Sequence, residues 1–161
     1  MSRGTVDLRG VSFGSPAAIV TSMALIVGLD AATVTRAAVI GALLIIGIAD
    51  NLTDSLSVHI YQEAERLAER QAFRTTVKNF AARLVVAVSF VFLFVLFRPA
   101  LAVHACVLWG FFLLSALSYL LAKSRGVRPL PEIGKHAAVA LIVIVVGKGL
   151  GVLIRTMIGS A

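Results

Sequence analysis

Long apolar stretches separated by short polar ones run along almost the whole chain, and each apolar stretch is long enough to cross a bilayer. A membrane-spanning helix needs about 20 mostly apolar residues, with a range of about 17–25. The predicted spans are residues 16–32, 33–57, 76–97, 100–121 and 137–158. No connection is long enough to separate two domains. The pattern therefore predicts an all-α membrane protein, with one transmembrane domain over residues 1–161 built as a bundle of five transmembrane helices.

Local signals predict several helix ends. Ser15-Pro16 predicts the start of the first helix, because proline is favoured at the first helical position. Arg98-Pro99 separates the third span from the fourth, since proline cannot continue the helical hydrogen bonding. Beyond its span, the second helix is predicted to continue as a polar helix through Gln71, extending into the cytoplasm.

The composition agrees with a membrane protein. Hydrophobic residues make up 59% of the chain and charged residues only 14%, against roughly 25% charged in soluble domains. The mean hydropathy is +0.97, which predicts an integral membrane protein in a lipid bilayer. The net charge of +7 could suggest nucleic acid, but no interleaved basic and aromatic pattern accompanies it, so no nucleic-acid partner is predicted.

The distribution of Lys and Arg predicts the orientation of the chain. With the N-terminus in the cytoplasm, eleven of the fifteen Lys and Arg residues lie inside, Arg83 among them. Three lie outside, and Lys148 lies within the fifth span. Cytoplasmic loops of membrane proteins carry such an excess of positive charge. We therefore expect an integral protein of a prokaryotic cytoplasmic membrane with a cytoplasmic N-terminus.

The most informative feature is a pair of carboxylates within the second span. Asp50 and Asp54 are four residues apart, and they share one sector of the helix with Ser57 and Glu65. A charged group in the bilayer costs about 2.5–3.5 kcal/mol on insertion scales, so it usually marks an ion pathway or a charge pair. Oxygen ligands that include carboxylates suit divalent cations. The candidate metal ligands are Asp50, Asp54, Asn51, Ser57 and Glu65, with Asn51 further round the helix.

The same carboxylates also fit a structural role. They could hydrogen-bond to neighbouring helices, or they could neutralise Lys148, which lies near the middle of the fifth span and is the candidate counter-ion. The glycines around Lys148 would let this helix approach its neighbours closely. No nucleophile–base arrangement, phosphate loop or Cys/His metal spacing is present, so neither an enzyme activity nor a tightly bound cofactor is predicted.

Two segments resemble the vacuolar iron transporter family. Phe13-Gly14, followed by Ala-Ala-Ile-Val-Thr-Ser at 17–22 and by Gly28-Leu29, is similar to the first helix of that family. Gly-Ile-Ala-Asp-Asn-Leu-Thr at 47–53 resembles Gly-Leu-Ala-Asp-Ala-Leu-Ser in its second helix. The resemblance covers residues 13–65. It implies a five-helix homodimer that moves Fe²⁺ or Mn²⁺ out of the cytosol against protons, with metal ligands near the dimer interface.

The chain also departs from the family pattern. Ala17 stands where the first helix of the family has Asp, and Asp54 stands where the second helix has Met. Ser57-Val58 replaces the Gly-Glu that follows. The separate cytosolic metal-binding helices of the longer members have no counterpart here. Asp54 would shift the ligand set from a thioether toward oxygen, and hence toward harder ions.

Two functions are therefore expected from the sequence. The first is transport or export of a divalent metal cation, Fe²⁺ or Mn²⁺, by a homodimer that uses the acids of the second helix and couples to protons. The alternative is a non-transporting membrane scaffold or assembly protein of the same fold, in which the acids form structural charge pairs. The expected partners are the metal ion, the lipid bilayer and a second copy of the chain.

Overall fold

The computed structural model describes residues 9–64 and 69–159, which form five α-helices. They are α1 (Arg9–Ala31), α2 (Arg36–Ala64), α3 (Glu69–Leu96), α4 (Pro99–Ser124) and α5 (Pro129–Ile158). Each helix is long and apolar enough to cross a membrane, and the described residues contain no strand, which confirms the prediction of an all-helical chain with five such helices.

Prolines and short turns set several of the helix boundaries. Pro99 and Pro129 occupy the first turns of α4 and α5, where the missing backbone N–H has no helical partner to lose. Gly126, with φ of 68°, turns the chain between these two helices. The start of the first helix differs from the prediction. Helix α1 already begins at Arg9, so Pro16 lies inside it and not at its first position. One proline removes a single backbone hydrogen bond and need not end a helix whose other residues favour it.

The end of α2 also corrects the prediction. The polar helix was expected to continue through Gln71, but α2 ends at Ala64 and Gln71 belongs to α3, which runs back antiparallel to α2. The two helices pack closely: a Cβ at Gly47 would come within 2.9 Å of the Ala87 Cβ. Helices in proteins gain most of their stability by packing an apolar face against a neighbour. The hairpin provides this packing, whereas a single extended polar helix would not.

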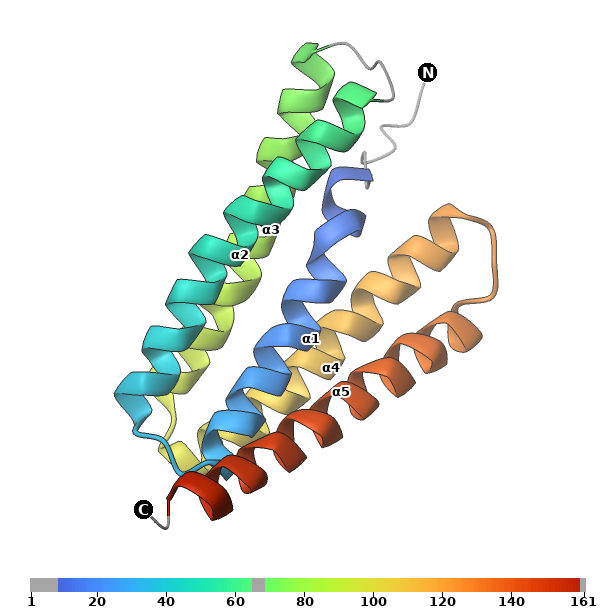
Figure 1. Cartoon of the computed structure of the whole chain (residues 1–161). Helices are drawn as coiled ribbons and strands as arrows, with labels where there is room; N and C mark the ends of the chain where they lie inside the picture. Colours follow the sequence, from blue (N-terminus) through green and yellow to red (C-terminus); the bar gives the residue numbers. More distant parts are fainter. Residues whose placement is uncertain (1–8, 65–68, 160–161) are drawn as a thin grey trace.

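The bundle consists of two hairpins with α1 between them. In Figure 1 the α2–α3 and α4–α5 hairpins diverge toward the upper end of the view, and α1 runs between them. Helix α1 packs against all four other helices, whereas α2 packs mainly on α3 and α1. The core between the helices contains Ile19, Met23 and Ile26 of α1, Phe90 and Phe94 of α3, and Cys106 and Leu114 of α4.

Small residues bring α1 and α5 into backbone contact. A Cβ at Gly147 would come within 2.9 Å of the Ala24 carbonyl oxygen, and one at Gly28 within 3.0 Å of the Gly147 carbonyl oxygen. A Cβ at Gly151 would overlap the Gly28 carbonyl oxygen. Small residues at the interface between two membrane helices allow the helix backbones to approach each other this closely. Gly149 has open space around it, so it plays no part in the contact.

This contact gives a stability prediction with a matched control. We expect Gly151→Ala to destabilise the protein by about 1–3 kcal/mol, because the added methyl group pushes α5 away from α1. Gly149→Ala should be neutral or should stabilise by up to about 1 kcal/mol, since alanine favours helices and meets no neighbour there. Melting temperatures of both variants in detergent check this result. Equal effects of the two changes would contradict the close contact.

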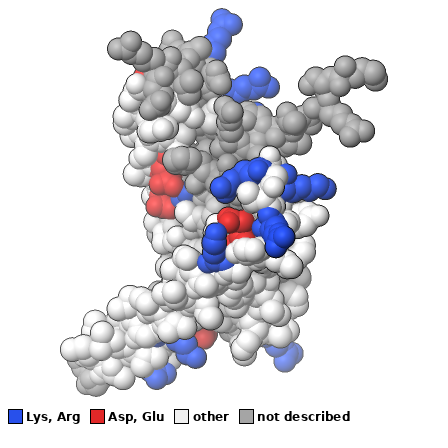
Figure 2. Space-filling view, turned by 90° about the vertical axis from the view of Figure 1, so that its right-hand side faces the viewer, with Lys and Arg blue, Asp and Glu red and all other residues white. Residues whose placement is uncertain are grey.

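The outer surface carries many large apolar side chains. The exposed ones on α3 and α5 include Val85, Phe92, Ile142, Val145 and Ile154. Figure 2 shows a broad uncharged band on the face in view, with Lys and Arg side chains gathered on either side of it. So large an exposed apolar surface is unusual for a soluble monomer and suits a lipid environment.

Candidate functional site

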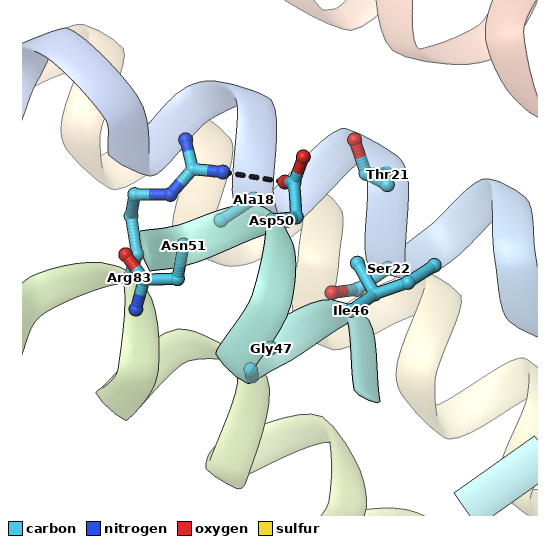
Figure 3. Close-up of a pocket in the computed structure, with 9 residues that line it drawn as sticks. Ala18, Thr21, Ser22, Ile46, Gly47, Asp50, Asn51 and Arg83 are labelled. Atoms are coloured by element: carbon cyan, nitrogen blue, oxygen red, sulfur yellow. Dashed lines mark hydrogen bonds and ion pairs between the residues drawn. The ribbon is translucent and has the colours of Figure 1, made fainter. Parts of the chain in front are cut away.

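A cluster of three charges joins α2 to α3. Asp50 and Asp54 lie one helical turn apart on α2, so their carboxylates point to the same side. Arg83 of α3 reaches both of them: its Nη2 donates to Asp50 Oδ2 at 2.7 Å, and its Nη1 pairs with Asp54 Oδ2. Figure 3 shows the Arg83 guanidinium directed toward the Asp50 carboxylate.

The absence of a side chain at Gly14 makes room for the arginine. The Arg83 Nη1 also donates to the Gly14 carbonyl oxygen of α1 at 3.0 Å. A Cβ at Gly14 would come within 2.6 Å of Asn79 Oδ1 and 2.7 Å of Arg83 Cδ. Glycine therefore allows α1 to pack directly on this cluster. Helix α1 contributes a backbone carbonyl oxygen to the site, as an acceptor, and no charged group.

Burial differs sharply between the cation and the two anions. The Arg83 side chain is 3% exposed, whereas those of Asp50 and Asp54 are 48% and 45% exposed. Each carboxylate uses one oxygen to accept from Arg83, and its Oδ1 has no hydrogen-bond partner within the described part of the chain. With both acids ionised, two carboxylates against one guanidinium leave a net charge of −1. The cluster thus presents unused carboxylate oxygens on the open side of α2.

The other predicted ligands do not converge on this side. Asn51 is 2% exposed, and its Nδ2 donates to the Phe80 carbonyl oxygen at 2.8 Å, toward α3. Ser57 donates to the Thr53 carbonyl oxygen at 3.0 Å. Glu65 lies outside the described residues. The structure therefore brings Asp50 and Asp54 together, keeps Asn51 beside them but directed inward, and leaves the Ser57 hydroxyl bonded to its own helix.

The cation beside the acids is Arg83 rather than the candidate counter-ion Lys148. Lys148 is exposed on α5, and it forms no ion pair with any residue in 9–64 or 69–159. Helix α5 packs mainly on α1 and α4, so its side chains do not face the acids of α2. The charge distribution predicts Arg83 on the cytoplasmic side, yet its side chain is buried inside the bundle. The sequence does carry a signal for this pair. Arg83 lies within the predicted third span, and the predicted second span contains both carboxylates.

A small cavity lies beside the cluster. It has a volume of about 10 Å³ and is lined by Ser22 and Thr21 of α1, Asp50 and Asn51 of α2, and Arg83 of α3, together with four small or apolar residues. A volume of this size holds about one water molecule. Within the described part of the chain, no three His, Cys, Asp or Glu side chains come close enough to hold a metal ion. A metal at this place would need other oxygen donors or a second copy of the chain.

Comparisons with protein-family models, curated proteins and solved structures gave no match to this chain. The class of the protein is therefore defined by its fold and its site. It has five helices long and apolar enough to span a membrane, with a carboxylate–guanidinium–carboxylate cluster between α1, α2 and α3. The resemblance to the iron transporter family stays a prediction.

Proposed function

We propose that this chain forms a homodimeric transporter for a divalent metal cation such as Fe²⁺ or Mn²⁺, with Asp50 and Asp54 as the transport site. One observation carries the proposal. The two half-exposed carboxylates lie on the open side of α2, and Arg83 neutralises only one of their charges. Their remaining oxygens are hard ligands of the kind that Mn²⁺ prefers.

Charge and surface together support a dimer. One cluster has a net charge of −1, so two clusters facing each other supply −2, which matches one divalent cation. The exposed surface of α2 also carries large apolar side chains, among them Ile45, Leu52 and Leu56. A second copy would cover the half-exposed acids, which would otherwise face lipid at a cost of about 2.5–3.5 kcal/mol each. It would also bring further oxygen donors to the metal.

The same oxygens could exchange a proton for the metal. A carboxylate that binds a metal ion must be deprotonated, so metal binding releases any proton that it holds. We therefore propose that the metal moves against protons, as the family resemblance implies. Arg83 would hold the two acids in position in both states.

We propose that the N-terminus and the α2–α3 and α4–α5 connections lie in the cytoplasm. The start of α1, the end of α2 and the end of α4 share one end of the bundle in Figure 1. Arg74, Lys123, Arg128 and Lys135 lie near that end, and such an excess of positive charge favours the cytoplasmic side of a prokaryotic membrane. Helix α2 has 29 residues, about 44 Å of helix against about 30 Å of hydrocarbon, which supports an extension into the cytoplasm.

Reconstituted protein tests the proposal. We expect purified protein in liposomes to take up Mn²⁺ or Fe²⁺, and an imposed pH gradient to change the rate. The mass of the particle in detergent or lipid should correspond to two chains. Absence of flux for both metals, in vesicles where the protein is folded, would contradict transport. A monomeric mass would contradict the shared site.

The second candidate is a membrane scaffold in which the charges are structural. The specific observation in its favour is that Arg83 pairs with both acids and so gives them a structural partner within the chain. Under this hypothesis the wild-type protein shows no flux for any divalent cation. Asp50→Asn would then lower stability without any transport activity to lose.

A further inference from the structure

Unpartnered buried polar atoms gather in one part of the bundle. Within the described residues, eight side-chain nitrogen or oxygen atoms are buried without a hydrogen-bond partner, and all of them belong to α1, α2 or α3. They are Ser15 Oγ, Asn51 Oδ1, Ser55 Oγ, His59 Nδ1, Gln62 Oε1, Asn79 Nδ2 and Oδ1, and Arg83 Nε. Buried polar atoms in native proteins are nearly always hydrogen-bonded, to protein or to ordered water.

These atoms follow one another along the helices. Asn51, Ser55, His59 and Gln62 occupy successive turns on one side of α2. From Asn51 to Gln62 the helix rises by about 16 Å, roughly half the thickness of the hydrocarbon core. The row therefore runs from the charged cluster toward the end of the bundle where α2 and α3 are connected.

Asn79 and Arg83 lie one turn apart on α3, beside this row. Asn79 is completely buried, and neither end of its amide has a partner. A Cβ at Gly14 would touch both side chains, which places α1 against them. We call the set of seven residues with unpartnered atoms (Ser15, Asn51, Ser55, His59, Gln62, Asn79 and Arg83) the polar seam.

The inner end of the polar seam has room for water. The cavity of about 10 Å³ beside Asp50 and Asn51 holds about one water molecule, and the Ser22 and Thr21 hydroxyls also line it. The seam contains both donors and acceptors: Arg83 Nε can only donate, Asn51 Oδ1 can only accept, and the serine hydroxyls can do either. Water can serve all of these atoms, whereas a metal cation or an anion would serve only some of them.

We propose that the polar seam binds a file of water molecules that hydrates the Asp50–Arg83–Asp54 cluster from the end where α2 and α3 are connected. Outside the small cavity the atoms of the seam are buried, so water enters when α1 separates slightly from α2. Helix α1 packs less closely on α2 than on α3 or α5, which favours this boundary for the opening. The use of the file as a route for protons rests on the proposed transport function, whereas the hydration itself does not.

Exchange of thiol hydrogen for deuterium tests water access with the smallest probe. Cys106 is the single cysteine of the chain and is completely buried. In a Cys106→Ala background, Ser55→Cys places a thiol in the polar seam. Ser118→Cys is the matched control, because Ser118 is also buried but its hydroxyl donates to the Leu114 carbonyl oxygen. Ser118 lies closer to the end of its helix than Ser55 does, so slower exchange at Ser118→Cys cannot be attributed to a greater distance from the helix end. Infrared spectra of protein in lipid nanodiscs after transfer to D₂O follow the exchange.

We expect the Ser55→Cys thiol to exchange about ten-fold faster or more than the Ser118→Cys thiol or the wild-type Cys106 thiol, because its site opens to water. Exchange at Ser55→Cys no faster than at Ser118→Cys would overturn the proposal. Ser15→Cys provides a second probe of the polar seam if Ser55→Cys does not fold. Fast exchange without metal flux would contradict the transport function but not the water file. Slow exchange together with metal flux would contradict the water file but not the transport function.

Discussion

Arg83→Met is expected to destabilise the protein by about 1–3 kcal/mol, because it removes the cation that pairs with Asp50 and Asp54 and the donor to the Gly14 carbonyl oxygen. Methionine keeps much of the volume and the flexibility of the arginine stem, so the lost charge dominates the effect. The melting temperature in detergent should fall by many degrees, or the protein should fail to fold.

Two variants make this result specific. Arg83→Met combined with Asp50→Asn and Asp54→Asn should recover most of the stability, because it leaves no unpaired carboxylate in the cluster. Arg98→Met removes an exposed cation at the link between α3 and α4, and should change stability by no more than about 0.5 kcal/mol. If the Arg83→Met protein were as stable as wild type, Arg83 would not stabilise the fold through the two carboxylates.

Asp54→Asn is expected to lower metal flux by about ten-fold or more, since one charge at contact distance contributes more than the 1.4 kcal/mol that corresponds to a factor of ten. Asparagine keeps an oxygen that can accept from Arg83, so the fold should survive. The cluster then changes from a net charge of −1 to zero, and a dimer from −2 to zero. Asp50→Asn should behave in the same way. Uptake of Mn²⁺ into liposomes measures the effect.

Asp30→Asn is the matched control for this change. Asp30 is an exposed carboxylate near the end of α1, away from the cluster, so the same substitution should leave flux unchanged. Lys148→Met should neither rescue nor worsen Asp54→Asn, because Lys148 makes no ion pair with the described residues. Full activity in Asp54→Asn would exclude this carboxylate from the transport site.

The spans could be predicted from sequence because hydrophobic length alone defines them. The rotation of each helix and its partner are set by packing, which hydropathy does not report. Lys148 and Arg83 both interrupt apolar runs, and only the helix arrangement decides which one meets the acids. Helix α5 packs on α1 and α4, so Lys148 stays apart, whereas α3 packs on α2.

The position of Arg83 depends on where the chain turns back between α2 and α3. In an antiparallel helix pair, residues at equal distances from the turn lie at the same level. The prediction of one helix through Gln71 moved the expected turn along the chain, and with it the residues expected at the level of the two acids. The inward direction of Asn51 depends on its bond to the Phe80 carbonyl oxygen, for which the sequence carries no signal.

The close contact between α1 and α5 has a consequence for the biosynthesis of the protein. Helix α1 leaves the ribosome before α5, and chains generally begin to fold from the N-terminus during synthesis. The Ala24–Gly28 surface of α1 can meet its native partner only after Gly147 and Gly151 of α5 have been made. Until then this surface stays in the membrane without its native contact. A ribosome that stops before α5 therefore leaves a protein that lacks this contact and is a substrate for quality-control proteases.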